Sequence, residues 1–168
     1  LSLNVTSKAY GLPGLRIGWI ACKDHNLLSA MERQKHYLSI CNSAPSEVLT
    51  VIALHARDWI LEKNRKLVTN NLNHLNAFFS DFPELFDWTP PDGSCVGYPR
   101  YKGKEGVEEF CKLAVEKSGI LLLPASIYNS EITDTESPND HFRIGYGRSN
   151  SIEAYSVLRK HINQYCNS

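Results

Sequence analysis

The feature of this sequence that most constrains its fold is a helical pattern that runs from residue 46 to residue 82. Apolar residues recur there near helical spacing, charged residues occupy the other positions, and Ser46 is expected to cap the start. A single helix of more than about 30 residues would far exceed the usual globular length of roughly 11–12. We therefore predict a helix that connects two separately packed bodies, with two helices broken near Lys63 as the alternative.

Two strands and a helix are predicted ahead of this pattern. Residues 1–5 form a short, apolar, β-prone run, and residues 15–22 form another that is rich in Ile, Trp and Leu. A loop rich in glycine and proline separates them over residues 8–14. Asp24 is expected to cap a helix over residues 27–40, and the first strand is expected to be buried.

Behind Pro83 the composition changes, and short strands alternate with helices. In chain order we expect a strand in PPDGSCVGYPRY, a helix over residues 106–117, a strand in GILLLPAS, a strand in HFRIGYGR and a helix over residues 149–166. Residues 129–140 are typical of a polar loop. This order predicts a small α/β unit of its own, and an α/β fold class for the chain.

Composition excludes several classes of protein. The chain has 168 residues, and its 18 Lys and Arg balance 18 Asp and Glu, which argues against a dedicated nucleic-acid surface. No apolar run approaches the roughly 20 residues that span a bilayer, so no membrane partner is expected. The cysteines are scattered without a C-x-x-C pair, which disfavours a disulfide framework or a zinc site and fits a reducing cytoplasm. No metal is expected. The cysteines are Cys22, Cys41, Cys95, Cys111 and Cys166.

The stretch TSKAYGLPGLRIGW, between the first two predicted strands, carries the candidate chemistry. A lysine amine such as that of Lys8 becomes a nucleophile when it is deprotonated, and it can then form a Schiff base with an aldehyde. Gly11 and Gly14 allow close approach of the main chain or positive φ. The alternative is an ordinary surface lysine ahead of a Gly/Pro turn, and spacing alone does not decide between the two.

The same stretch can also bind an anion. The guanidinium of Arg16 presents a fork of donors that suits a phosphate. The hydroxyls of Thr6 and Ser7 and the loop amides can add further donors. The loop could therefore hold a phosphate and present Lys8 to a group attached to that phosphate.

SKAYGLPGLRIGW closely resembles the cofactor-lysine motif of the fold-type I pyridoxal-phosphate enzymes, in the class I/II aminotransferase family. The resemblance implies that Lys8 carries pyridoxal 5'-phosphate as an aldimine. It also implies that Arg16 binds the phosphate, with a hydroxyl of Ser7 or Thr6 assisting. The shared elements are Ser7-Lys8, Gly11, Gly14, Arg16 and Gly18.

The resemblance extends along the chain and implies three parts. Residues 1–45 would be the end of a large cofactor-binding domain, residues 46–82 an interdomain helix, and residues 83–168 a small carboxyl-terminal α/β domain. HFRIGYGR resembles the strand whose arginine binds the substrate α-carboxylate, which would be Arg143, with Arg148 as the competing candidate. Alternation along this strand predicts that Phe142 and Ile144 face the core and that Arg143 lies on the other side, as a guanidinium with no standing partner. By this resemblance the chain is expected to be the carboxyl-terminal portion of a longer enzyme.

The function implied by the resemblance is pyridoxal-phosphate-dependent transamination between an amino acid and a 2-keto acid, in a homodimer. Lys8 would move a proton between the substrate α-carbon and the cofactor, first as general base and then as general acid. Because the motif specifies the cofactor rather than the outcome, a lyase, a decarboxylase or a cyclising synthase of the same fold is the alternative. A non-catalytic anion-binding or interaction fragment is the rival from another class.

Overall fold

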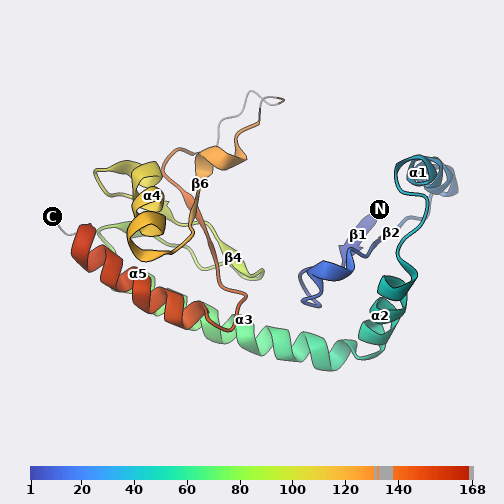
Figure 1. The fold of residues 1–168 in the computed structure, drawn as a ribbon, viewed down its shortest axis with the longest axis horizontal. Helices are drawn as coiled ribbons and strands as arrows, with labels where there is room; N and C mark the ends of the chain where they lie inside the picture. The colour runs from blue at the N-terminus through green and yellow to red at the C-terminus, as the bar shows by residue number, and fades with distance from the viewer. Residues whose placement is uncertain (131, 133–137, 167–168) are drawn as a thin grey trace. The chain divides into compact units, whose positions relative to one another are not determined.

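A computed structural model of the chain describes residues 1–130, 132 and 138–166. Its contacts divide into two compact units, Leu1–Arg65 and Lys66–Ser168, with the division inside one helix (Figure 1). Half of the polar loop expected over residues 129–140 lies outside the described residues. The domain limits inferred from the sequence, at residues 45 and 82, stay a prediction.

The first unit opens with a β-hairpin. β1 (Ser2–Val5) pairs antiparallel with β2 (Gly18–Ala21), and Val5 lies opposite Gly18. A Cβ at Gly18 would lie 2.8 Å from the main-chain oxygen of Asn4, so this position accepts only glycine without a shift of the backbone. The predicted strands are confirmed, but the predicted burial of the first is wrong. All four residues of β1 are exposed, because a two-stranded ribbon buries little apolar surface by itself.

Helix α1 (His25–Leu38) begins where its capping residue predicts. The Asp24 carboxylate accepts hydrogen bonds from the main-chain amides of Asn26 and Leu27, at 2.9 and 3.1 Å. Capping of this kind satisfies amides that have no partner within the helix. The predicted helix and its cap are therefore confirmed.

Two helices, not one, cover the long helical pattern. α2 (Ala44–His55) and α3 (Arg57–Ser80) are separated at Ala56, which has φ −90° and ψ 14°. The prediction of one continuous helix is wrong, and the alternative of two helices is confirmed with the break at Ala56 instead of near Lys63. Ser46 is not the cap either, since α2 starts two residues earlier.

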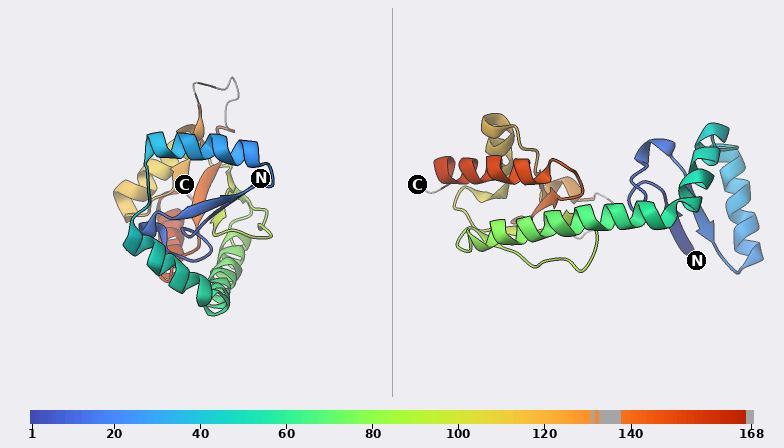
Figure 2. Two further views of the ribbon diagram at one scale, coloured as in Figure 1. Left: turned by 90° about the vertical axis from the view of Figure 1, so that its right-hand side faces the viewer. Right: turned by 90° about the horizontal axis from the view of Figure 1, so that it is seen from below.

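The second unit is a small α/β body. β7 (Phe142–Gly145) is the centre of an antiparallel sheet, between β4 (Val96–Gly97) and β6 (Leu123–Pro124). α4 (Gly106–Ser118) and α5 (Ser151–Tyr165) complete the predicted order. In both Figure 1 and Figure 2, α5 runs alongside the part of α3 that belongs to this unit.

Aromatic and aliphatic side chains from α3, α4, β7 and α5 meet in one core. Phe110 stacks on Tyr101 with ring centroids 4.2 Å apart, and Phe78 lies 6.3 Å from Tyr155 across the helix pair. Burial of these rings is the main stabilising contribution in the unit. The largest fully buried apolar side chains are Tyr146, Phe78, Phe110, Phe142, Leu75, Leu158 and Ile162.

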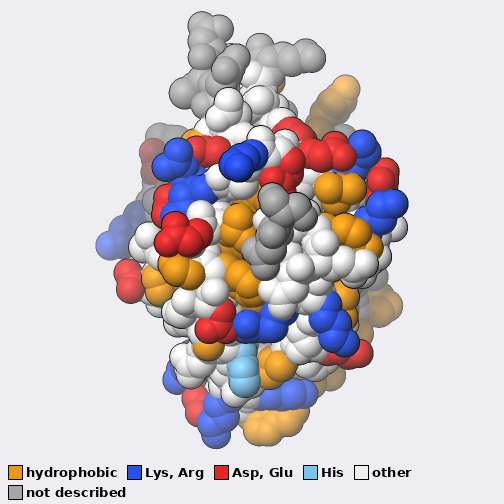
Figure 3. Space-filling model, turned by 90° about the vertical axis from the view of Figure 1, so that its left-hand side faces the viewer, with side chains coloured by type: hydrophobic (Ala, Val, Ile, Leu, Met, Phe, Trp, Pro, Cys, Tyr) orange, Lys and Arg blue, Asp and Glu red, His pale blue; other side chains and the backbone are white. Residues whose placement is uncertain are grey.

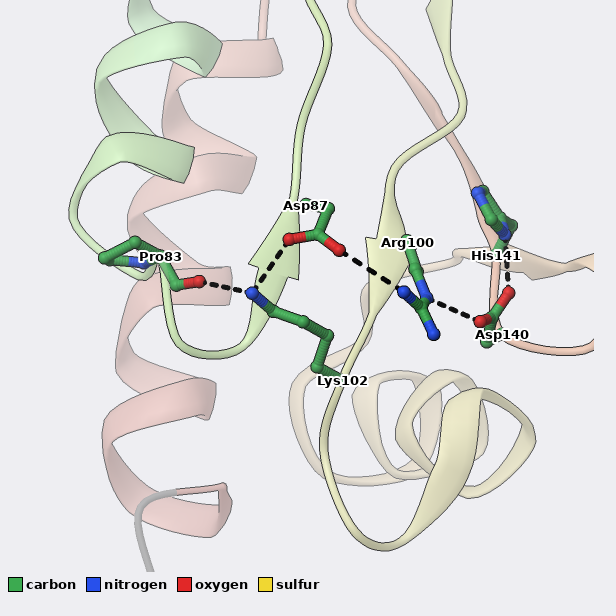
Figure 4. A network of polar contacts seen from close by, with 6 residues as sticks. All are labelled: Pro83, Asp87, Arg100, Lys102, Asp140 and His141. Atoms are coloured by element: carbon green, nitrogen blue, oxygen red, sulfur yellow. Dashed lines mark hydrogen bonds and ion pairs between the residues drawn. The ribbon is translucent and has the colours of Figure 1, made fainter.

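A polar network joins a second, two-stranded sheet to the start of β7. The sheet pairs β3 (Phe86–Asp87) with β5 (Arg100–Tyr101). Lys102 Nζ lies 2.8 Å from the Asp87 carboxylate, and Arg100 Nε donates to Asp140 at 2.6 Å. The hydrogen bond from Lys102 lowers the pKa of Asp87. The network consists of Pro83, Asp87, Arg100, Lys102, Asp140 and His141 (Figure 4).

Charges of both signs are mixed on the surface. On the face drawn in Figure 3, acidic and basic side chains alternate around apolar ones, so this face carries no large field of one sign. A single-sign basic field is what a nucleic-acid surface needs. Among the helices of the described residues, none has the length and apolar character needed to cross a membrane.

A short 3-10 helix, η2 (Ala125–Tyr128), follows β6.

Candidate active site

The turn that carries Lys8 joins the two strands of the hairpin. The Gly11 amide donates to the Lys8 carbonyl at 3.0 Å and closes the turn. Gly11 has φ +66°, in the left-handed region that favours glycine. A 3-10 helix, η1 (Pro13–Leu15), then leads to β2. The glycine and proline of the sequence motif therefore shape the loop around the lysine.

Thr6 holds this loop closed from the inside. Its side chain is fully buried, and its Oγ1 lies 3.1 Å from the Ile17 carbonyl and 3.4 Å from the Leu12 carbonyl. A hydroxyl has a single proton to donate, and here that proton is directed to main-chain oxygens of the loop. Ser7, by contrast, is partly exposed and has no side-chain hydrogen bond within residues 1–130, 132 and 138–166. Of the two hydroxyls, that of Ser7 is therefore the one open to a ligand.

The amine of Lys8 is open to a ligand. The side chain is exposed, and it forms no ion pair or hydrogen bond with any residue that the structure describes. A lysine that stabilises a surface usually does so through a carboxylate partner. The Lys8 amine is therefore accessible to a carbonyl group, with which a deprotonated lysine can form a Schiff base.

Arg16 is held in an unusual backbone conformation. It ends η1 with φ 57° and ψ 32°, in the left-handed region. A non-glycine residue in a sparsely populated region costs about 1–3 kcal/mol, and such residues cluster at functional sites. One guanidinium nitrogen donates to the Pro13 carbonyl at 3.1 Å. The remaining donors of the fork are available to an anion.

These groups together fit pyridoxal 5'-phosphate. The phosphate needs donors, and the loop supplies the Arg16 guanidinium and the Ser7 hydroxyl. The aldehyde needs an amine, and the same loop supplies Lys8. The residues predicted from the sequence thus lie on one loop, with Thr6 buried beneath it as a structural residue of that loop.

Arg143 lies on β7, in the second unit. Its neighbours Phe142 and Ile144 are 0% and 4% exposed, so the predicted alternation is confirmed and Arg143 is on the other face of the strand. The guanidinium was expected to have no standing partner, and that expectation is wrong. Its Nη1 donates to the hydroxyl of Tyr128 at 3.3 Å. No sequence signal marks Tyr128, because it belongs to a short 3-10 helix 15 residues away.

Arg148, the competing candidate, is exposed ahead of α5. Its contacts are made by the main chain: its carbonyl accepts hydrogen bonds from Ser151 Oγ at 2.8 Å and from Asn71 Nδ2 at 2.7 Å. These bonds attach the segment ahead of α5 to Ser151, the first residue of that helix, and to α3. Arg143 differs from Arg148 in being only partly exposed as a residue and in using its guanidinium for a side-chain contact, and which of the two binds a carboxylate stays a prediction.

Comparison with known proteins decides the family. The sequence profile described as Aminotransferase class I and II matches residues 1–156. This chain belongs to that family. Among curated relatives, capreomycidine synthase of Streptomyces vinaceus is 26% identical over 146 residues, which are 87% of this chain and 35% of that protein. Aspartate aminotransferase of Rhizobium meliloti is 30% identical over 161 residues, which are 89% of this chain and 37% of that protein.

Solved structures agree on the fold. A PLP-dependent aminotransferase from Streptococcus suis matches 99% of this chain and 42% of its own, with a TM-score of 0.86 and 24% sequence identity. The family member described here thus spans between about a third and two-fifths of the length of the proteins it matches. The predicted α/β class and aminotransferase fold are confirmed.

Proposed function

We propose that the protein containing this chain is a pyridoxal-phosphate-dependent aminotransferase that moves an amino group between an amino acid and a 2-keto acid. The observation that carries the proposal is the Lys8 loop. It combines an unpaired amine, a free hydroxyl at Ser7 and a guanidinium at Arg16 in a chain that belongs to the class I and II family.

Each residue of the proposed site has a separate task. Arg16 and Ser7 hold the phosphate and so fix the position of the cofactor. Lys8 Nζ would hold the cofactor carbonyl carbon until the amine of the substrate displaces it, and the freed Lys8 amine would then accept the proton from the substrate α-carbon as a general base. Bound pyridoxal phosphate supplies an electron sink for the charge left on that carbon. Arg143 holds the substrate carboxylate and orients the C–H bond that breaks.

The protein's wider setting is part of the same proposal. We place the enzyme in the cytoplasm, since the scattered cysteines suit a reducing compartment. A homodimer is proposed from the resemblance described above. Aspartate is the first amino donor to try, because it is named for the Rhizobium meliloti relative.

An absorption cycle tests the proposed reaction. The holoenzyme is expected to have a visible absorption band that falls on addition of the amino acid and returns on addition of the 2-keto acid. A band that falls without returning with any keto acid would indicate a lyase or a cyclising synthase. The absence of any such band in the full-length protein would support the non-catalytic alternative.

The two hydroxyls of the loop are expected to respond differently to removal. Ser7→Ala should raise the cofactor dissociation constant about tenfold or more, because it removes a hydrogen bond to a charged group. The free energy of unfolding of Ser7→Ala in urea should change little. Thr6→Val should lower the free energy of unfolding by about 0.5–1.5 kcal/mol, because the loop loses the hydrogen bond of the buried hydroxyl while the Ile17 and Leu12 carbonyls keep main-chain amides as donors.

Equilibrium binding of the cofactor and urea unfolding measure the two effects. The opposite result would be that Thr6→Val weakens cofactor binding without lowering the free energy of unfolding, while Ser7→Ala leaves cofactor binding unchanged. The phosphate contact would then belong to Thr6.

A further inference from the structure

Asn64 of α3 reaches the turn that carries Lys8. Its Nδ2 donates a hydrogen bond to the main-chain oxygen of Ala9 at 2.8 Å, across 55 residues of sequence. Ala9 is the second residue of the turn that Lys8 opens and Gly11 closes. This hydrogen bond fixes the orientation of the peptide between Ala9 and Tyr10, next to Lys8.

The same side chain also lies near the far end of the turn. A Cβ built on Gly11 would lie 3.5 Å from Asn64 Nδ2, so the space beside Gly11 borders on the Asn64 amide. The hydrogen bond to Ala9 is the contact by which Asn64 holds the turn. Ala9 and Gly11 lie in the first unit, as Asn64 does.

Asparagine is a poor helix former, so its position inside α3 needs a reason. The helix holds another asparagine of the same kind: Asn71 Nδ2 donates to the main-chain oxygens of Tyr146 and Arg148, at 2.9 and 2.7 Å, in the second unit. Asn70, in contrast, is exposed and makes no side-chain hydrogen bond with the described residues. Asn64 and Asn71 thus both donate a side-chain hydrogen bond to a main-chain oxygen outside the helix.

We propose that Asn64 is a positioning residue for Lys8. It holds the turn in the conformation from which the amine meets the cofactor and, later, the substrate proton. The catalytic consequence of this inference rests on the proposed function. Asn64 would act through the turn and would contact neither the cofactor nor the substrate. Small displacements of a reacting group cost rate more than binding, because the group must be oriented in the transition state.

Hydrogen exchange in the cofactor-free protein tests the tether directly. In Asn64→Ala, the Gly11 and Leu12 amides, both hydrogen-bonded within the turn, should exchange about 3- to 10-fold faster, which is the effect of one hydrogen bond. Alanine favours a helix more than asparagine does, so α3 itself should not loosen. Asn70→Ala is the matched control and should exchange as the wild type does. Unchanged exchange in Asn64→Ala would overturn the proposal.

The holoenzyme tests the consequence. Asn64→Ala should lower kcat about 3- to 10-fold and raise the cofactor dissociation constant by a similar factor, with KM for the amino acid within about twofold. Faster exchange with unchanged kcat and cofactor affinity would overturn the positioning role. If the wild-type protein carried no cofactor on Lys8, the proposed function would fail, whereas the exchange experiment, which needs no cofactor, would still decide whether Asn64 holds the turn.

Discussion

Replacing Lys8 with alanine is expected to abolish nearly all transamination by the holoenzyme. Loss of the proton transfer alone implies a fall in kcat of about 10²- to 10⁴-fold, and loss of the bond to the cofactor adds to it. The exposed side chain contributes no ion pair or hydrogen bond among the described residues, so stability should be unaffected. Steady-state kinetics with an amino acid and a keto acid, beside urea unfolding, measure both quantities.

Lys23→Ala provides the matched control, because Lys23 is also an exposed lysine of the first unit. It should retain wild-type kcat. Substantial turnover in Lys8→Ala, or an equal loss of kcat in Lys23→Ala, would show that Lys8 has no specific role in the reaction.

Arg143→Lys is expected to raise KM for the amino acid and the keto acid together. A lysine cannot reproduce the two parallel hydrogen bonds of the guanidinium fork. Loss of a desolvated, charged hydrogen bond implies about 2–5 kcal/mol, and the lower value is about 30-fold in affinity. Because Arg143 is only partly buried and already contacts Tyr128, we expect an effect near the lower value. Cofactor affinity should change little, since the phosphate is proposed to bind Arg16 and not Arg143.

Arg148→Lys distinguishes the two candidate arginines. Its structural contacts are made by the main chain, so this variant should keep wild-type KM and stability. If Arg148→Lys raises KM and Arg143→Lys does not, the carboxylate site has been assigned to the wrong residue. If Arg143→Lys releases the cofactor and leaves substrate affinity intact, the roles of Arg16 and Arg143 are reversed.

Structure that depends on neighbouring residues can be predicted from this sequence. The Asp24 cap is a contact across two and three residues, and it appears as expected. The alternation around Arg143 depends only on the period of a strand, so Phe142 and Ile144 reach the core as predicted. The Lys8 motif could be recognised because its glycines, proline and arginine all serve one short loop.

Features that depend on distant contacts or on weak local preferences could not be predicted. The break at Ala56 has no glycine or proline within five residues on either side, so the apolar pattern continues across it. Thr6 is buried and Ser7 is open to a ligand because the Thr6 hydroxyl is the one that lies against the Ile17 carbonyl in the folded hairpin. Asn64 reaches Ala9 only in the folded chain, and its place in the sequence is that of an ordinary helix residue.

Reductive trapping identifies the lysine that carries the cofactor. Borohydride reduction of the holoenzyme should attach one pyridoxyl group irreversibly to a lysine, and proteolysis with mass spectrometry then identifies that lysine. We expect the label on Lys8, with none on Lys8→Ala protein treated in the same way. A label on Lys23, Lys63 or any other lysine of the wild-type protein, or no label at all, would show that Lys8 does not carry the cofactor.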